Sequence, residues 1–150
     1  MQNILKLKQH FLDDGVRINQ PATEKEILLF EKLHNILLPN DLKEYFLLFN
    51  GTGEGNFGDS GYAFFSLDEL KLVVDESSTS DEKEIYKDCF AFSDYMVWCW
   101  GYVIKLSETV GDNPVYSIHL EKPPKHKVAN SFSEFINLYL EDPDDVIGCG

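Results

Sequence analysis

Three glycines near the middle of the chain have the spacing of a dinucleotide-binding loop, because Gly53, Gly55 and Gly58 match the pattern GxGxxG. In such a loop the glycines follow a strand and open a helix, whose N-terminus receives the pyrophosphate. Here they follow a predicted helix and precede a predicted strand. The neighbouring acids Glu54 and Asp59 would also repel a phosphate group. The pattern therefore predicts a loop and no nucleotide cofactor.

The remaining reactive side chains lack the spacing of a catalytic or metal site. The segment from Gly58 to Gly61 is similar to the serine region of trypsin-like proteases, but a triad also needs a histidine base oriented by an acid. The upstream histidines, His10 and His34, both fall in predicted helices. Neither the histidines nor the cysteines have metal-ligand spacing, and these residues are His10, His34, His119, His126, Cys89, Cys99 and Cys149. We predict no catalytic residue and no metal site.

The charge of the chain restricts its partners. The 150 residues include 26 acidic and 13 basic side chains, which give a formal net charge of −13. Nucleic acid phosphates and anionic membranes would be repelled, whereas a basic protein would be attracted. A hydrophobic fraction of 43% and an aromatic fraction of 13% are typical of a globular domain rather than of a disordered acidic tail. Solubility alone is the competing explanation of the acidity.

The sequence also predicts where the protein is found. Its first residues lack the apolar core of a signal peptide. No run approaches the roughly 20 apolar residues that span a bilayer. The three cysteines are odd in number and form no CxxC pair, as expected of reduced thiols. We therefore expect a cytoplasmic protein.

Three helices are expected in the first fifty residues. They cover residues 1–13, the stretch opened by a capping box of Thr23 and Glu26, and a stretch from Pro39 that ends at Asn50. Apolar residues in each repeat every three or four positions, which predicts a face turned toward the core. These residues are Ile4, Leu7 and Phe11; Ile27, Phe30, Leu33 and Leu37; and Leu42, Tyr45, Phe46 and Phe49.

Strands follow, and a helix closes the chain. The expected strands cover residues 62–65, 89–92, 96–106 and 115–121. Two further capping boxes predict a short helix from Ser66 to about Val74 and a helix that begins at Ser131. This order predicts an α+β fold for a single domain of residues 1–150, with a central, mainly antiparallel sheet flanked by N-terminal and C-terminal helices.

The most aromatic strand has two apolar faces. Alternation places one set of large side chains on one face, namely Met96, Trp98, Trp100, Tyr102 and Ile104, with smaller residues on the other. Such a strand is expected near the centre of a sheet. If residues 93–95 form a tight turn, Cys89 faces Cys99, and we predict that these thiols are close but reduced.

Several segments together resemble a known family. They are residues 24–31, 38–51, 92–98 and 131–136, with signatures such as Leu38-Pro39-Asn40-Asp41-Leu42-Lys43-Glu44-Tyr45-Phe46. This pattern is similar to the SUKH superfamily of Smi/Knr-like proteins and resembles its bacterial members. The resemblance implies an α+β domain with a helix-flanked sheet. It also implies an immunity protein that neutralises a cognate polymorphic toxin, often a nuclease, or a regulatory scaffold as in fungal relatives.

The resemblance and the charge together suggest a binding site. A nuclease has a cationic cleft, so an acidic inhibitor could place carboxylates where phosphates would lie. We expect protein-binding charges at Glu54, Asp59 and Asp94, and aromatic anchors at Tyr62 and Tyr95. The acids between Asp75 and Asp88 form a second candidate patch. A scaffold whose partner is not basic and a small enzyme with a concave pocket remain alternatives, and the oligomeric state stays open.

Overall fold

Three helices precede the sheet. The computed structural model describes residues 2–58, 61–73, 79–80, 86–96, 100–109, 111–118 and 126–141. The helices are α1 (Gln2–Asp13), α2 (Glu24–His34) and α3 (Asn40–Leu48). The predicted capping box opens α2: the Glu26 amide donates to Thr23 Oγ1, and the Thr23 amide donates to Glu26 Oε1, each over 3.1 Å. Asn35 ends α2 in the left-handed conformation at φ 55°.

The strands of the described residues form one antiparallel sheet. They are β1 (Tyr62–Phe64), β2 (Lys71–Leu72), β3 (Cys89–Tyr95), β4 (Trp100–Lys105), β5 (Val115–Ile118) and β6 (His126–Ala129). Their order is β1-β3-β4-β5-β6, and β2 pairs separately with β3. The last helix, α5 (Phe132–Glu141), follows β6. The α+β class predicted from the sequence is confirmed.

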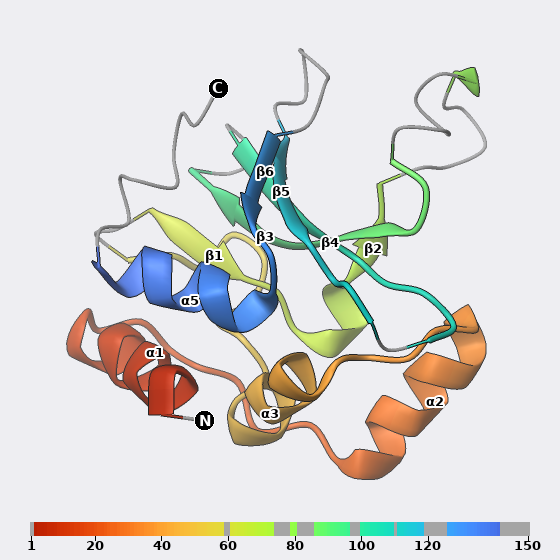
Figure 1. The fold of residues 1–150 in the computed structure, drawn as a ribbon. Helices are drawn as coiled ribbons and strands as arrows, with labels where there is room; N and C mark the ends of the chain where they lie inside the picture. The colour runs from red at the N-terminus through yellow and green to blue at the C-terminus, as the bar shows by residue number, and fades with distance from the viewer. Residues whose placement is uncertain are drawn as a thin grey trace.

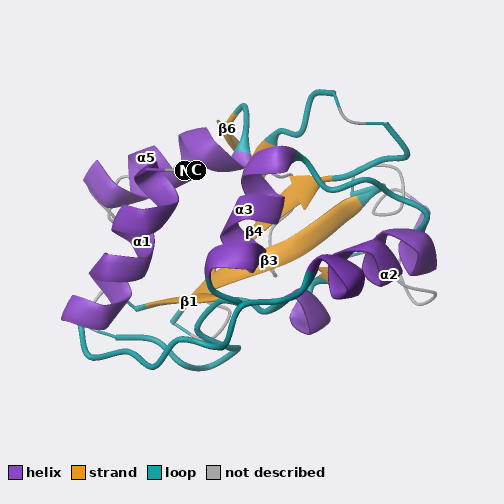
Figure 2. Ribbon diagram, turned by 90° about the horizontal axis from the view of Figure 1, so that it is seen from below, coloured by secondary structure: helices purple, strands orange, loops and turns teal. Residues whose placement is uncertain are grey.

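The helices cover one face of the sheet. Figure 1 shows α1, α2 and α3 below the strands, with α5 crossing close to β1 and β3. Seen from below, α3 lies across β3 and β4, α1 and α5 gather at one end, and α2 lies at the other (Figure 2). Among the helices that the structure describes, α2 therefore lies apart from α1 and α5, at the opposite end of the sheet.

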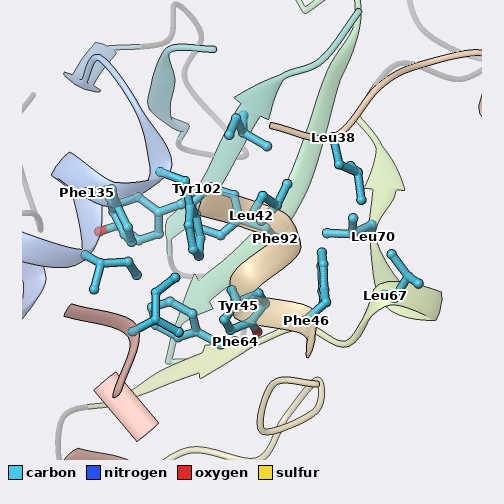
Figure 3. Close-up of a cluster of buried hydrophobic side chains, with 14 of the residues drawn as sticks. Leu38, Leu42, Tyr45, Phe46, Phe64, Leu67, Leu70, Phe92, Tyr102 and Phe135 are labelled. Carbon is cyan, nitrogen blue, oxygen red and sulfur yellow. The ribbon is translucent and has the colours of Figure 1, made fainter. Parts of the chain in front are cut away.

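The main core fills the space between the helices and the sheet. Leu42, Tyr45 and Phe46 of α3 point toward Phe64, Phe92 and Tyr102 of the strands (Figure 3). The C-terminal helix adds its predicted apolar face, all of it fully buried: Phe132, Phe135, Ile136 and Tyr139. The predicted inward faces of α1 and α3 are confirmed as well. Periodic apolar residues thus meet around α3, which explains why this short helix has a central position.

The opposite face of the sheet carries a second, smaller cluster. Its buried members are Phe65, Tyr86, Cys89, Ala91, Val103 and Ile118. In β4, Tyr102 and Ile104 belong to the main core while Val103 belongs to this cluster. The alternation predicted for this strand is therefore confirmed from Tyr102 to Ile104, and β4 lies between β3 and β5 as expected of a central strand. The predicted start of the strand at Met96 is wrong, because Met96 follows β3 in a turn with a φ of 49° and is 44% exposed. Residues 97–99 lie outside the described residues.

The tight turn expected at residues 93–95 is wrong. These residues complete β3, where Asp94 pairs with Gly101 and Cys89 with Lys105, so the predicted register that placed Cys89 opposite Cys99 is also wrong. Cys99 itself lies outside the described residues. The strand continues through these residues because they pair with β4 on one side and with β1 on the other. In addition, Ser93 Oγ donates to the Ala63 carbonyl over 2.8 Å. Ser93, a residue type that favours turns, thus has its hydroxyl hydrogen-bonded inside a sheet.

Two helix predictions also need correction. The expected core stripe of α2 fails beyond Phe30, because Leu33 is 80% exposed and Leu37 lies after the helix end. The helix expected from Ser66 to Val74 is instead a single 3-10 turn, Leu67–Glu69, followed by β2. Pairing of Lys71 and Leu72 with β3 draws that segment into the sheet, so sheet hydrogen bonds outcompete the local helix signal.

Candidate functional site

The glycine-rich loop is fastened to β1. The amides of Thr52 and Gly53 donate to the Phe64 carbonyl over 2.8 and 3.0 Å, and the Phe64 amide donates to Thr52 Oγ1 over 3.0 Å. Gly51 has a φ of 73°, and a Cβ at this position would lie 2.5 Å from the Phe64 oxygen. Only glycine accommodates both the conformation and this close approach. The loop is therefore held against the sheet at its start.

Glu54 extends from this loop and is already paired. Its carboxylate lies 3.0 Å from Lys71 Nζ, and its amide donates to Glu69 Oε2 over 3.0 Å. Both side chains of the ion pair are exposed, so the pair contributes little to stability. A charged partner could exchange for Lys71 at small cost. Glu54 thus lies at the surface, as the sequence predicted, whereas Asp59 lies outside the described residues.

Two of the expected contact residues are interior. Tyr62 is 0% exposed and its hydroxyl lies 3.3 Å from that of Tyr102. Burial is the main cause that raises the pKa of Tyr62 above the ordinary tyrosine value, followed by the neighbouring Tyr102. Asp94 is 1% exposed within β3. The prediction that these side chains line an exposed surface is therefore wrong. Asp94 lies in β3, which pairs with β1 on one side and β4 on the other, and the Tyr62 ring packs against Tyr139 of α5.

Tyr95 keeps part of its surface. It ends β3 opposite Tyr62, and the two rings are 5.1 Å apart. Gly61 packs against it closely enough that a Cβ there would lie 2.7 Å from the Tyr95 ring. Tyr62 thus positions Tyr95 instead of meeting a partner itself. The contacts described for Glu54 are with Lys71 and Glu69, and those described for Tyr95 are with Tyr62 and Gly61.

A different surface, which the sequence analysis missed, is apolar and exposed. It consists of three leucines of α2 and two from neighbouring segments, and we call it the leucine surface: Leu28, Leu29, Leu33, Leu37 and Leu47. Leu28 is 57% exposed and Leu33 80%. Around the helix axis, at 100° per residue, the mean direction of the buried residues Ile27, Phe30 and Glu31 differs by about 110° from the direction of Leu33. One sequence signal could have indicated this orientation of α2: the polar residue Glu31 lies on the same side of the helix as the buried Ile27 and Phe30.

Two clefts border Leu28. One has a volume of about 480 Å³ and lies toward the end of α2, lined by Leu28, Glu31, Lys32, Asn35, Ile36, Leu37 and Glu108. The other has a volume of about 180 Å³ and lies toward α3, lined by Glu24, Ile27, Leu28, Glu31, Lys43 and Leu47. Leu28 and Glu31 line both. Leu28 therefore forms a ridge between two hollows, and both hollows are also lined by Glu31.

Glu31 is 6% exposed and has a structural role. Its Oε2 accepts a hydrogen bond of 2.7 Å from the Leu38 amide and lies 3.7 Å from Lys43 Nζ. These contacts offset the desolvation of a buried carboxylate. Two further contacts fix the segment after α2: the Leu37 amide donates to the Ser107 carbonyl, and Asn35 Nδ2 donates to Glu108 Oε1, each over 2.8 Å. The walls of the larger cleft are thus tied together by hydrogen bonds.

His10 is a half-buried titratable side chain between two helices. His10 Nε2 lies 2.9 Å from the Tyr139 hydroxyl and joins α1 to α5. Burial lowers the pKa of His10, and the nearby Asp14 and Asp13 oppose this shift.

Within the described ranges, histidine, cysteine, aspartate and glutamate form no group of three that could hold a metal ion. None of the helices described is long and apolar enough to cross a membrane.

Comparison with known proteins identifies the fold family. No curated protein sequence matches the chain. The family model described as the SMI1 / KNR4 family (SUKH-1) matches residues 21–138, which is well over half of the 150 residues. The match spans α2, α3, the sheet and most of α5, while α1 precedes it. The chain therefore belongs to the SMI1 / KNR4 family, SUKH-1.

Proposed function

We propose that this protein is a cytoplasmic immunity protein that binds and neutralises a cognate polymorphic toxin with a basic nuclease domain. The observation that carries the proposal is the combination of SUKH-1 membership with twice as many acidic as basic side chains. A protein with a formal charge of −13 attracts the cationic cleft in which a nuclease binds phosphates. Neutralisation then consists of covering that cleft.

Surface carboxylates supply the long-range part of this recognition. Complementary charge raises association rates by about 10–10³-fold at low salt, and salt screens the effect. Glu54 is exposed beside the readily exchanged Lys71, and Tyr95 keeps an accessible edge. We include both, together with Asp59, among the residues that meet the toxin during encounter. Tyr62 and Asp94 act from the interior by holding β1 and β3 in place.

The test uses the toxin that would accompany such a protein. The basic C-terminal domain of a large secreted protein encoded beside this chain is purified, and its nuclease activity is measured with and without the protein. We expect stoichiometric inhibition, with an association rate that falls steeply between about 50 and 500 mM salt. Glu54→Gln is expected to slow association at low salt, whereas Glu141→Gln on α5 serves as an exposed control with the same charge change.

Each of three results would contradict the proposal or a part of it. Failure of the protein to bind the domain would refute the pairing. Binding without any loss of nuclease activity or of toxicity would instead favour a regulatory scaffold. Salt-independent association would contradict the electrostatic part alone.

A further inference from the structure

The leucine surface includes five of the nine large hydrophobic side chains that are exposed among the described residues. Single exposed leucines are ordinary, but contiguous apolar surface with a polar border marks an interaction site. Leu28, Leu29 and Leu33 are exposed residues of α2, which lies at one end of the sheet (Figure 2). Leu37 lines one cleft together with Leu28, and Leu47 lines the other. Folding alone does not account for these leucines, since the core-facing side of α2 uses other residues.

We propose that the leucine surface is the docking site for the basic toxin domain, whose apolar side chains fill the two clefts beside Leu28. This inference rests on the proposed function and names the surface that performs it. In this arrangement, lysines or arginines of the toxin approach the exposed carboxylates of Glu24 and Glu108. Long-range attraction by the acidic chain speeds encounter, and the leucine surface slows dissociation.

The shape of the surface fits buried anchors. Well-packed anchors in desolvated pockets provide most of the energy of a protein interface. A ridge formed by Leu28, with a hollow of about 480 Å³ on one side and one of about 180 Å³ on the other, can receive a large and a small side chain. The hydrogen bonds that tie Asn35 to Glu108 and Leu37 to Ser107 hold the larger hollow open before binding. A preformed site loses less conformational freedom on association.

Charge selects a basic occupant over a second copy. The residues that line the two clefts include three acids and two lysines: Glu24, Glu31, Glu108, Lys32 and Lys43. Glu31 is buried and already bonded to the Leu38 amide, so the exposed Glu24 and Glu108 are the acids of the clefts that a cation of the partner can approach. Two copies of this chain would each bring a formal charge of −13 to the contact, and this repulsion disfavours self-association.

Paired leucine substitutions test the inference. The variant Leu28→Ser/Leu33→Ser removes two exposed leucines of α2, and Leu5→Ser/Leu12→Ser removes two exposed leucines of α1 as a matched control. Because all four side chains are exposed, both variants are expected to fold, which circular dichroism and urea unfolding check. Binding to the purified basic toxin domain is measured by calorimetry and by dissociation kinetics. We expect the α2 variant to raise Kd at least about tenfold, mainly through faster dissociation, and the α1 variant to change it less than about twofold.

The outcomes separate this inference from the proposed function. If the wild-type protein inhibits the toxin and the α2 variant binds equally well, the inference is overturned while the immunity function stands. If the wild-type protein does not bind the domain, the proposed function fails, and the inference with it. A wild-type dimer in sedimentation that dissociates on Leu28→Ser/Leu33→Ser would assign the surface to a second copy and also overturn the inference.

Discussion

The contact between Gly51 and β1 predicts an unusually large effect from adding one methyl group. Gly51 has a φ of 73°, and a Cβ built there lies 2.5 Å from the Phe64 oxygen and 2.7 Å from the Phe65 oxygen. Both neighbours are backbone atoms of the sheet, so neither can rotate away. We therefore expect Gly51→Ala to force the loop off β1.

The loss of stability expected for Gly51→Ala has two contributions. Left-handed backbone conformation at a non-glycine residue costs about 1–2 kcal/mol. Ordinary contact begins near 3.4 Å, so the loop must move by most of an ångström, which strains the bonds from the Thr52 and Gly53 amides to the Phe64 carbonyl. Each such bond is worth about 0.5–1.5 kcal/mol net. Gly51→Ala should thus lower the free energy of unfolding by about 2–5 kcal/mol.

Gly15 provides a matched control. Its φ of 74° is nearly the same, but nothing lies within 4 Å of the Cβ that an alanine would add. Gly15→Ala should therefore show the conformational contribution alone, about 1–2 kcal/mol. Urea unfolding followed by tryptophan fluorescence measures both variants, and each kcal/mol is worth about 2–4 °C in Tm for a chain of this size. Equal destabilisation of the two variants would refute the reasoning, because the close approach to β1 would then contribute nothing.

Three further perturbations test individual contacts. Glu31→Ala should lower the free energy of unfolding by about 1–3 kcal/mol, because it leaves the buried Leu38 amide without its acceptor; Glu31→Gln retains an acceptor and should cost less in the same urea titration. Burial lowers the pKa of His10, so the folded state disfavours its protonation; the stability it contributes is present above the unfolded pKa near 6.5 and is lost as pH falls below that value. His10→Gln should therefore flatten the loss of stability between pH 7 and pH 5, and an unchanged slope would contradict this. Asn35→Ala and Asn35→Gly both lose the hydrogen bond to Glu108, but only alanine is strained at the φ of 55°, so Asn35→Ala should be about 1 kcal/mol less stable than Asn35→Gly in thermal unfolding.

Much of the helical structure could be predicted because its signals are local. The capping box of Thr23 and Glu26 forms as expected, and the Glu134 amide donates to Ser131 Oγ at the start of α5 over 3.0 Å. Such signals act over three or four residues, where chain geometry alone brings the partners together. The buried apolar residues of α1, α3 and α5 follow the predicted periodicity for the same reason.

The candidate site was harder to predict because exposure depends on distant neighbours. Asp94 has the residue type of a turn or surface site, yet β1 and β4 pair on its two sides and bury it. Leu33 has the residue type and the spacing of a core position, yet it is exposed because α2 packs through Ile27, Phe30 and Glu31. Neither outcome is encoded within a few residues of the position concerned.

The sequence by itself determined the charge, the α+β order of elements and the family, since these depend on composition, local periodicity and motif spacing. Only the tertiary structure decided which polar residues are interior and which leucines are exposed. The physical reason is that burial is a property of the assembled layers. When a strand continues past an expected turn, or when a helix rotates by about 100° around its axis, its buried and exposed faces change. The local conformational preferences of its residues stay the same. In this protein that assembly removes Tyr62 and Asp94 from the surface and leaves the leucine surface of α2 exposed.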